Sequence, residues 1–150
     1  MAVELPLTGT EIWMTDASPA ALDVARANAS GLGRAAANVR IALGSWFEAL
    51  DAHDLAGTID VIVSNPPYVA VGDGEVQTSV VEWEPHEALF SGSDGLDDVR
   101  VIVSHASTWL RPGGWLILEI GHAQGSAVRE LFATSGFVDV AVGRDLATAA

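Results

Sequence analysis

Four consecutive residues, Asn65 to Tyr68, have the types and the order needed to hold a planar amino group. They follow an apolar run at 59–64, which we expect to be a strand. Each proline lacks an N–H and has φ fixed at about −65°, and a residue before proline is forced into an extended shape. The Asn65 side-chain oxygen and the Pro66 carbonyl can then point the same way. Two such acceptors can bind both hydrogens of an –NH2 group, and Tyr68 can stack on its plane.

The same four residues also have a purely structural interpretation, because Asn-Pro is common in turns. We favour binding, since Asn-Pro-Pro-Tyr at the end of an apolar strand is far more specific than Asn-Pro alone. Rigid positioning of this kind suits a group transfer that has no covalent intermediate.

Polar residues also follow two earlier strands. Asp16 ends one predicted strand, and Ser45 with Trp46 follows the next. In a doubly wound sheet, ligands bind beyond the carboxyl ends of the strands. In a complete sheet of this kind, an acid that closes the second strand holds ribose hydroxyls, and Asp16 is a candidate for that acid. An ordinary turn or helix-capping aspartate is the alternative for Asp16, and by itself it is the more common case.

Strand and helix patterns alternate along the chain, which predicts an α/β fold with a mostly parallel sheet. Ser18 and Pro19 have the types found at a helix start. We expect the apolar strands at 59–64 and 115–120 to be buried and the segment 69–95 to be irregular. The predicted strands are 11–16, 38–43, 59–64, 115–120 and 137–142, and the predicted helices are 19–31, 46–51, 97–110 and 124–134.

The composition bounds the chemistry of the chain. Its 150 residues suit one domain, and its net charge of −13 argues against a nucleic-acid partner without excluding one. It has no lysine and no cysteine, which excludes a P-loop, Schiff-base chemistry and thiolate catalysis. The four histidines lack metal-ligand spacing, and the glycines at 31–33 fit a helix end better than a nucleotide loop. Without a signal peptide or a membrane span, we expect the cytoplasm.

Five further stretches extend the pattern around the tetrapeptide. They are TDASPAALDVARAN (15–28), GSWFEAL (44–50), EPHEALFSGSDGLDDVR (84–100), LRPGGWLILEIGHAQ (110–124) and GFVDVAVGRDL (136–146). Together they resemble the PrmC/HemK family, S-adenosylmethionine-dependent glutamine methyltransferases that act on peptide chain release factors. A nucleic-acid methyltransferase acting on adenine or guanine amino groups shares the tetrapeptide and stays an alternative, as does an inactive remnant.

The resemblance implies a Rossmann-like class I methyltransferase fold and a role for each candidate residue. Asp16 would bind the ribose of S-adenosylmethionine, and Ser45 and Trp46 would line its adenine end. Asn65 would touch both cofactor and substrate, and the residues Asn65, Pro66, Pro67 and Tyr68 would hold the glutamine amide of a Gly-Gly-Gln motif. Glu82, Glu84 and Glu119 are candidate bases that we do not favour, because their surroundings, EP and LEIG, can equally serve loop and sheet structure.

The sequence also departs from the family. The glycine-rich loop, the strand before it, the helical N-terminal domain and a last antiparallel strand have no counterpart, so the resemblance implies a catalytic domain (1–150) truncated at both ends. We therefore expect unpaired edges on the strands that end at Asp16 and Ser64. Because a buried unpaired backbone group costs about 1–3 kcal/mol, the sheet should rearrange or associate with a second copy.

Overall fold

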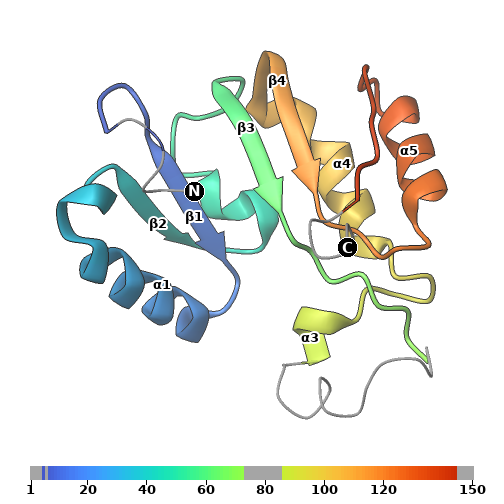
Figure 1. The fold of residues 1–150 in the computed structure, drawn as a ribbon, viewed down its shortest axis with the longest axis horizontal. Coiled ribbons are helices and arrows are strands. Elements are labelled where there is room, and N and C mark those ends of the chain that lie inside the picture. Colours follow the sequence, from blue (N-terminus) through green and yellow to red (C-terminus); the bar gives the residue numbers. More distant parts are fainter. Residues whose placement is uncertain (1–4, 6, 73–85, 145–150) are drawn as a thin grey trace. The chain divides into compact units, whose positions relative to one another are not determined.

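The computed structural model describes residues 5, 7–72 and 86–144 (Figure 1). The chain forms two compact units, Met1–Leu55 and Ala56–Ala150, and each is described by itself. Both units combine helices with a pair of parallel strands. The predicted α/β class is confirmed.

In the first unit, β1 (Ile12–Asp16) pairs in parallel with β2 (Val39–Leu43). The connection contains α1 (Pro19–Leu32) and a short 3-10 helix, η1 (Gly33–Ala36), and a second 3-10 helix, η2 (Trp46–Leu50), follows β2. The predicted strands and helices of this unit are confirmed, with the 46–51 helix in 3-10 form.

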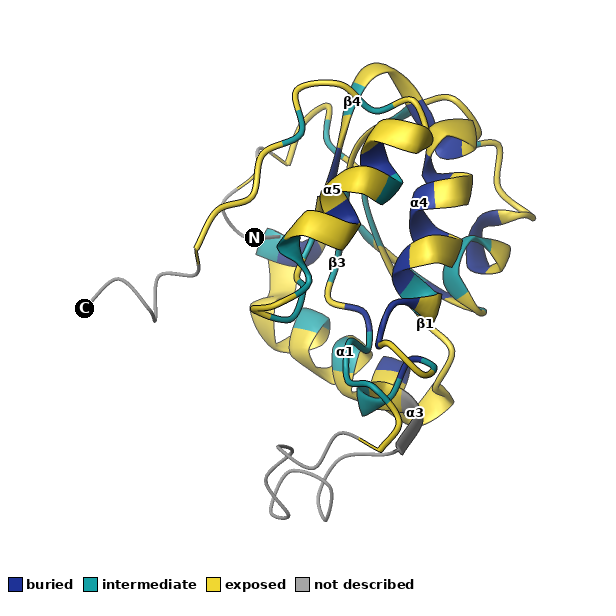
Figure 2. Ribbon diagram, turned by 90° about the vertical axis from the view of Figure 1, so that its right-hand side faces the viewer, coloured by how far each residue is buried: buried dark blue, intermediate teal, exposed yellow. Residues whose placement is uncertain are grey.

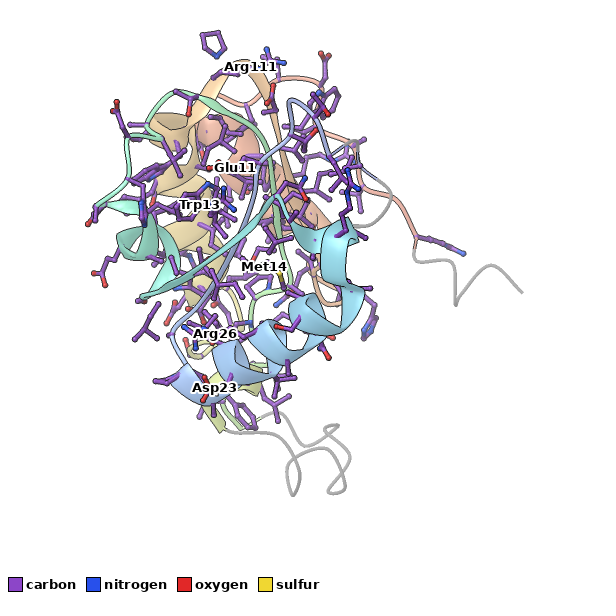
Figure 3. The ribbon with its side chains drawn as sticks, turned by 90° about the vertical axis from the view of Figure 1, so that its left-hand side faces the viewer. Glu11, Trp13, Met14, Asp23, Arg26 and Arg111 are labelled. Atoms are coloured by element: carbon purple, nitrogen blue, oxygen red, sulfur yellow. The ribbon has the colours of Figure 1, made fainter. Side chains whose placement is uncertain are left out.

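The boundaries of α1 follow from its sequence. The Ser18 hydroxyl accepts a hydrogen bond from the Ala21 N–H at 3.3 Å, and Pro19 occupies the first turn. The helix passes the predicted stop at Gly31 by one residue and ends at Leu32, and Gly33, whose φ of 56° favours glycine, caps it. Asp23 and Arg26 form an exposed ion pair at 2.8 Å on its surface (Figure 3).

Strand β1 carries Trp13, whose indole N–H donates to Glu11 at 2.7 Å (Figure 3). The Trp13 ring also contacts the His53 ring, with their centroids 4.1 Å apart. Leu22 of α1 and Leu50 of η2 are among the buried side chains that form the core of this unit.

In the second unit, β3 (Ile59–Ser64) pairs in parallel with β4 (Leu110–Leu118), with α3 (His86–Leu89) and α4 (Asp97–Trp109) between them and α5 (Gly125–Thr134) after them. The predicted helix at 97–110 is confirmed together with its buried face, formed by Val99, Ile102, Val103, Ala106 and Trp109. Figure 2 shows this buried face on α4 and a shorter one on α5. Helix α4 contacts both β4 and α5.

The helix ends at Trp109, one residue before its predicted end, and the sequence 111–114 predicted to break it lies within β4. The strand begins at Leu110, five residues before its predicted start at 115. A shift in register between Ile59 and Val61 accommodates the extra residues, and Gly113 takes a φ of 80° that a side chain would disfavour.

The prediction that β3 and β4 are buried is wrong for one face of the strand pair. Val61 pairs with Trp115 and Val63 with Ile117, and these four side chains are 47–61% exposed. On the opposite face Leu116 is buried. The reason is that α4 packs against one face only, and no described residue of this unit buries the other.

The predicted strand at 137–142 is also wrong, because this segment forms no strand. Val138 is 83% exposed, and Asp139 has a φ of 55°, which interrupts the extended conformation. An alternating apolar pattern produces a strand only where a neighbour pairs with it, and within 86–144 this segment pairs with none.

Among the described residues, β1 pairs only with β2, and β3 pairs only with β4. The strands that end at Asp16 and Ser64, β1 and β3, therefore each have one edge without a strand partner among the described residues, as expected from the sequence. Association through these edges stays a prediction. No described helix has both the length and the apolar character that a membrane span requires.

Candidate functional site

The first unit brings three predicted site residues to one end of its strand pair. Asp16 is the last residue of β1 and pairs with Leu43, the last residue of β2. The Gly44 N–H donates to the Asp16 carbonyl at 3.1 Å, so the chain leaving β2 runs directly past Asp16. Ser45 and Trp46 follow immediately, which places them at the same carboxyl edge as Asp16.

The Asp16 carboxylate serves the local turn, which was the structural alternative for this residue. Its Oδ1 accepts the Ser18 N–H at 2.7 Å and so helps to start α1. The side chain is exposed, and Oδ2 has no hydrogen-bond partner among the described residues. One oxygen therefore holds the turn, and the other is available to accept a hydrogen bond from a ligand.

Trp46 is held in a strained conformation. Its φ of 47° lies in the left-handed region, which costs a non-glycine residue about 1–3 kcal/mol. The preceding turn is tight, because a Cβ on Gly44 would lie 2.5 Å from the backbone nitrogen of Ala49. The Trp46 side chain is half-buried, and its backbone follows directly on this close approach of η2 to the end of β2.

In the second unit, the tetrapeptide begins where the β3 ladder ends. The Ser64 carbonyl accepts the Glu119 N–H at 3.0 Å. Asn65 is exposed, and its side chain makes no hydrogen bond to any described residue. Pro66 is fully buried, whereas Pro67 and Tyr68 are half-buried. A buried proline therefore anchors the backbone while the neighbouring amide projects into solvent.

The chain after Tyr68 is fastened to a second segment by three backbone hydrogen bonds. The Val69 N–H donates to Leu89 at 3.0 Å, the Ser91 N–H donates to Val69 at 2.9 Å, and the Val71 N–H donates to Gly92 at 2.8 Å. These bonds make a short parallel bridge that ties the chain directly after the tetrapeptide to residues 89–92.

That second segment is in turn fixed to the start of α4. The buried Ser91 hydroxyl accepts the Asp98 N–H at 2.8 Å. Arg100 binds the Asp94 carboxylate at 2.5 Å and Asp97 at 2.9 Å. The hydrogen bond from Arg100 is the main reason that the pKa of Asp94 is lower than usual, and the same bond raises the pKa of Arg100.

One residue at this site had no role in the sequence interpretation. Gln124 precedes α5, and its side chain contacts the backbone of Tyr68, Gly95 and Gly121. The only signal in the sequence is a glutamine at a helix start, where Ser, Thr, Asp or Asn is usual. Glu119 is exposed at the end of β4, and Glu82 and Glu84 lie outside the described residues.

The site residues predicted from the sequence therefore fall into two groups. The first unit places Asp16, Ser45 and Trp46 at one strand end. The second unit places residues 65–68 at the end of β3, on a segment braced by its neighbours. The described residues thus supply a carboxylate and an indole in one group and an exposed amide on a rigid backbone in the other.

Comparison with known proteins identifies relatives over nearly the whole chain. The chain is 45% identical over 146 residues to the release factor glutamine methyltransferase of Xylella fastidiosa. This alignment covers 97% of the chain and 51% of the Xylella protein. The proteins of the same name from Cereibacter sphaeroides and Geobacter sulfurreducens are 47% and 40% identical over 133 and 146 residues, with 46% and 49% of their lengths covered. These alignments take in 88% and 97% of the chain. No protein-family model matches the chain.

The chain spans about half the length of the curated relatives it matches. Its mixed α/β structure with parallel strand pairs is consistent with part of a class I methyltransferase fold. The resemblance predicted from the sequence is confirmed, and the chain is homologous to the release factor glutamine methyltransferases over most of its own length.

Proposed function

We propose that the chain carries catalytic parts of an enzyme that methylates peptide chain release factors. The methyl group comes from S-adenosylmethionine, and the acceptor is the side-chain amide nitrogen of the glutamine in a Gly-Gly-Gln motif. The observation that supports this most directly is Asn65, an exposed amide without a described partner that follows β3 and precedes the buried Pro66. The relatives carry the name of a glutamine methyltransferase, and the acidity of the chain disfavours a nucleic-acid acceptor.

On the substrate side, the chain's role is to hold an unreactive nitrogen in line. An amide nitrogen is a poor nucleophile because its lone pair is delocalised into the carbonyl. The Asn65 side-chain oxygen and the Pro66 carbonyl would accept its two N–H groups, and the Tyr68 ring would cover its plane. The nitrogen would gain the methyl group as the bond between the methyl carbon and the sulfonium sulfur breaks and leaves a neutral thioether, and it would lose one proton to water, directly or along a hydrogen bond to a backbone acceptor. Alignment of this kind can supply much of the rate enhancement.

On the cofactor side, a carboxylate oxygen and an indole in the first unit would suit the ribose and the adenine of S-adenosylmethionine. The Oδ2 atom of Asp16 would accept a hydrogen bond from a ribose hydroxyl while Oδ1 continues to hold Ser18. Ser45 and the half-buried Trp46 side chain would line the adenine end, and Asn65 would contact the cofactor as well as the substrate. When bound, S-adenosylmethionine supplies a methyl group activated by a positively charged sulfur.

The test is a transfer assay with labelled S-adenosylmethionine. A release factor containing Gly-Gly-Gln is offered as the acceptor, and tRNA, rRNA and DNA are offered separately. Asn65→Ala should lower transfer by at least about 100-fold, since it removes a group that aligns the acceptor. Asn28→Ala is the matched control, because Asn28 is an exposed asparagine on α1 outside the site, and this variant should keep wild-type activity.

Three results would overturn the proposal. Methylation of a nucleic acid but not of the release factor would favour the amino-group methyltransferase alternative. Full activity of Asn65→Ala would remove the role given to the tetrapeptide. No transfer, together with no heat of binding at millimolar S-adenosylmethionine, would identify the chain as an inactive remnant.

A further inference from the structure

A side chain from a distant part of the sequence binds the backbone of the tetrapeptide. The Nε2 group of Gln124 donates hydrogen bonds to the Tyr68 carbonyl at 3.0 Å and to the Gly95 carbonyl at 3.1 Å. Its Oε1 atom accepts the Gly121 N–H at 2.8 Å. One amide thereby joins the end of the tetrapeptide, the loop before α4 and the turn before α5.

The chemistry of this contact requires an amide. A carboxamide has two N–H donors and one acceptor oxygen, and all three functions are used here. The Tyr68 and Gly121 contacts are partly buried, so a group left without its partner would be only partly solvated. Neither a carboxylate nor an apolar side chain of the same length can replace both donors.

Two glycines make the fit around this amide close. Gly95 has a φ of +74°, and a Cβ at this position would overlap the Tyr68 carbonyl oxygen and lie 2.8 Å from Nε2 of Gln124. A Cβ on Gly121 would lie 3.0 Å from Oε1 of Gln124 and 3.5 Å from the Tyr68 ring. The Tyr68 carbonyl is therefore confined from two sides. On one side is the Gln124 Nε2 group, from which it accepts a hydrogen bond, and on the other is the backbone of Gly95.

We propose that Gln124 is a positioning residue for the methyl-transfer site. It fixes the direction of the Tyr68 carbonyl, and the stiff segment before Tyr68 transmits this constraint to the Pro66 carbonyl and to Asn65. This inference rests on the proposed function. Gln124 acts through Tyr68 and does not contact the acceptor, so its loss should impair alignment more than binding. The result is a fall in kcat with little change in KM.

The discriminating substitution is Gln124→Glu. It preserves side-chain length and the oxygen that accepts from Gly121, and it replaces the donor to Tyr68 and Gly95 with an oxygen that repels both carbonyls. We expect kcat to fall by about 10- to 100-fold, with KM for the release factor and for S-adenosylmethionine within about twofold of wild type. Asn28→Asp is the control, since it makes the same amide-to-acid change at an exposed site on α1.

Amide hydrogen exchange measured by NMR tests the contact without any activity. In Gln124→Glu the Val69 and Val71 amides should exchange faster, because the segment that carries them has lost its anchor. The Gly121 amide should stay protected, because its acceptor remains. In Gln124→Met the Gly121 amide should exchange faster as well. These measurements remain informative if the wild-type chain transfers no methyl group.

A wild-type kcat in Gln124→Glu would overturn the proposal, as would a rise in KM with kcat unchanged. Unchanged exchange at Val69 and Val71 would also overturn it, whatever the activity. If Gln124→Glu does not fold, Gln124→Met is measured in its place. That variant has neither donors nor charge, so the same kcat and KM criteria apply.

Discussion

The glycine beside the tetrapeptide offers a sharp test of how tightly the site is built. We consider Gly95→Ala, with Gly57→Ala as its matched control in the same unit. The two glycines have similar φ values, +74° and +68°, but a Cβ on Gly57 would meet no atom within 4 Å. Left-handed backbone costs alanine about 1–2 kcal/mol, and a stiffer unfolded chain returns about 0.4–1 kcal/mol. Gly57→Ala should therefore destabilise the chain by about 1 kcal/mol.

Gly95→Ala carries a second cost. Its Cβ would overlap the Tyr68 carbonyl, so either that carbonyl or the Gly95 loop must move, and the hydrogen bond to Gln124 is strained or lost. A fully buried carbonyl left unpaired costs about 1–3 kcal/mol; the contact at Tyr68 is partly buried, so the lower part of that range applies and the expected total is about 2–3 kcal/mol. A shift on the order of 1 Å near the acceptor should also lower the transfer rate by about 100-fold.

Urea unfolding followed by circular dichroism measures the first effect, and the labelled transfer assay measures the second. Both are run on the two variants and the wild type under the same conditions. Equal losses of stability in Gly95→Ala and Gly57→Ala, with equal transfer rates, would refute the reasoning. That result would mean that the loop gives way freely and that the Tyr68 carbonyl is not confined.

Three further predictions concern the rest of the chain. Asp16→Asn should weaken S-adenosylmethionine binding by about 10-fold in calorimetry. It should not lower the free energy of unfolding, because the asparagine side-chain oxygen can still accept the Ser18 N–H. Asp16→Ala should weaken binding and also destabilise the fold by about 0.5–2 kcal/mol, because this hydrogen bond is lost. Ile102→Ala should lower the free energy of unfolding in urea by about 2–5 kcal/mol, because Ile102 is only 1% exposed. Ile117→Ala should lower it by about 1 kcal/mol, because Ile117 is 51% exposed. Equal losses would show that the face of β3 and β4 that carries Ile117 is covered. Because the folded protein lowers the pKa of Asp94, the stabilisation from this carboxylate is complete above the ordinary aspartate pKa of about 3.9 and is lost as the pH falls through the folded pKa. Asp94→Asn should therefore make the free energy of unfolding fall less steeply with decreasing pH in the acid range. An acid range unchanged by this substitution would contradict the prediction.

Local signals explain why so many elements could be predicted. The cap at Ser18 with Pro19 fixes where α1 begins, and the apolar spacing of α4 places Val99 and Ile102 in the core, because both effects act within a few residues. The end of β3 just before Asn65 also follows from local chemistry, since two consecutive prolines cannot continue the strand ladder. Whether these predicted site residues bind as proposed stays a prediction.

The failures arise where neighbours decide. The alternating pattern at 137–142 predicts a strand, but it contains no information on whether another strand pairs with it, and no described strand does. The apolar pattern of β3 likewise does not reveal that Val63 is 50% exposed. Both outcomes depend on what packs against the segment, which sequence periodicity does not contain.

The sequence by itself determined the order of the four strands and of the helices α1, η2, α4 and α5, the Asn-Pro-Pro-Tyr segment that follows β3, and the polar residues at the strand ends. It did so because caps, prolines and hydrophobic periods act over a few residues. Only the tertiary structure decided that Gln124 binds the Tyr68 carbonyl, 56 residues away, and that Gly95 leaves no room beside it. The physical reason is that a hydrogen bond between distant segments depends on how the chain between them folds, and no local pattern records that path.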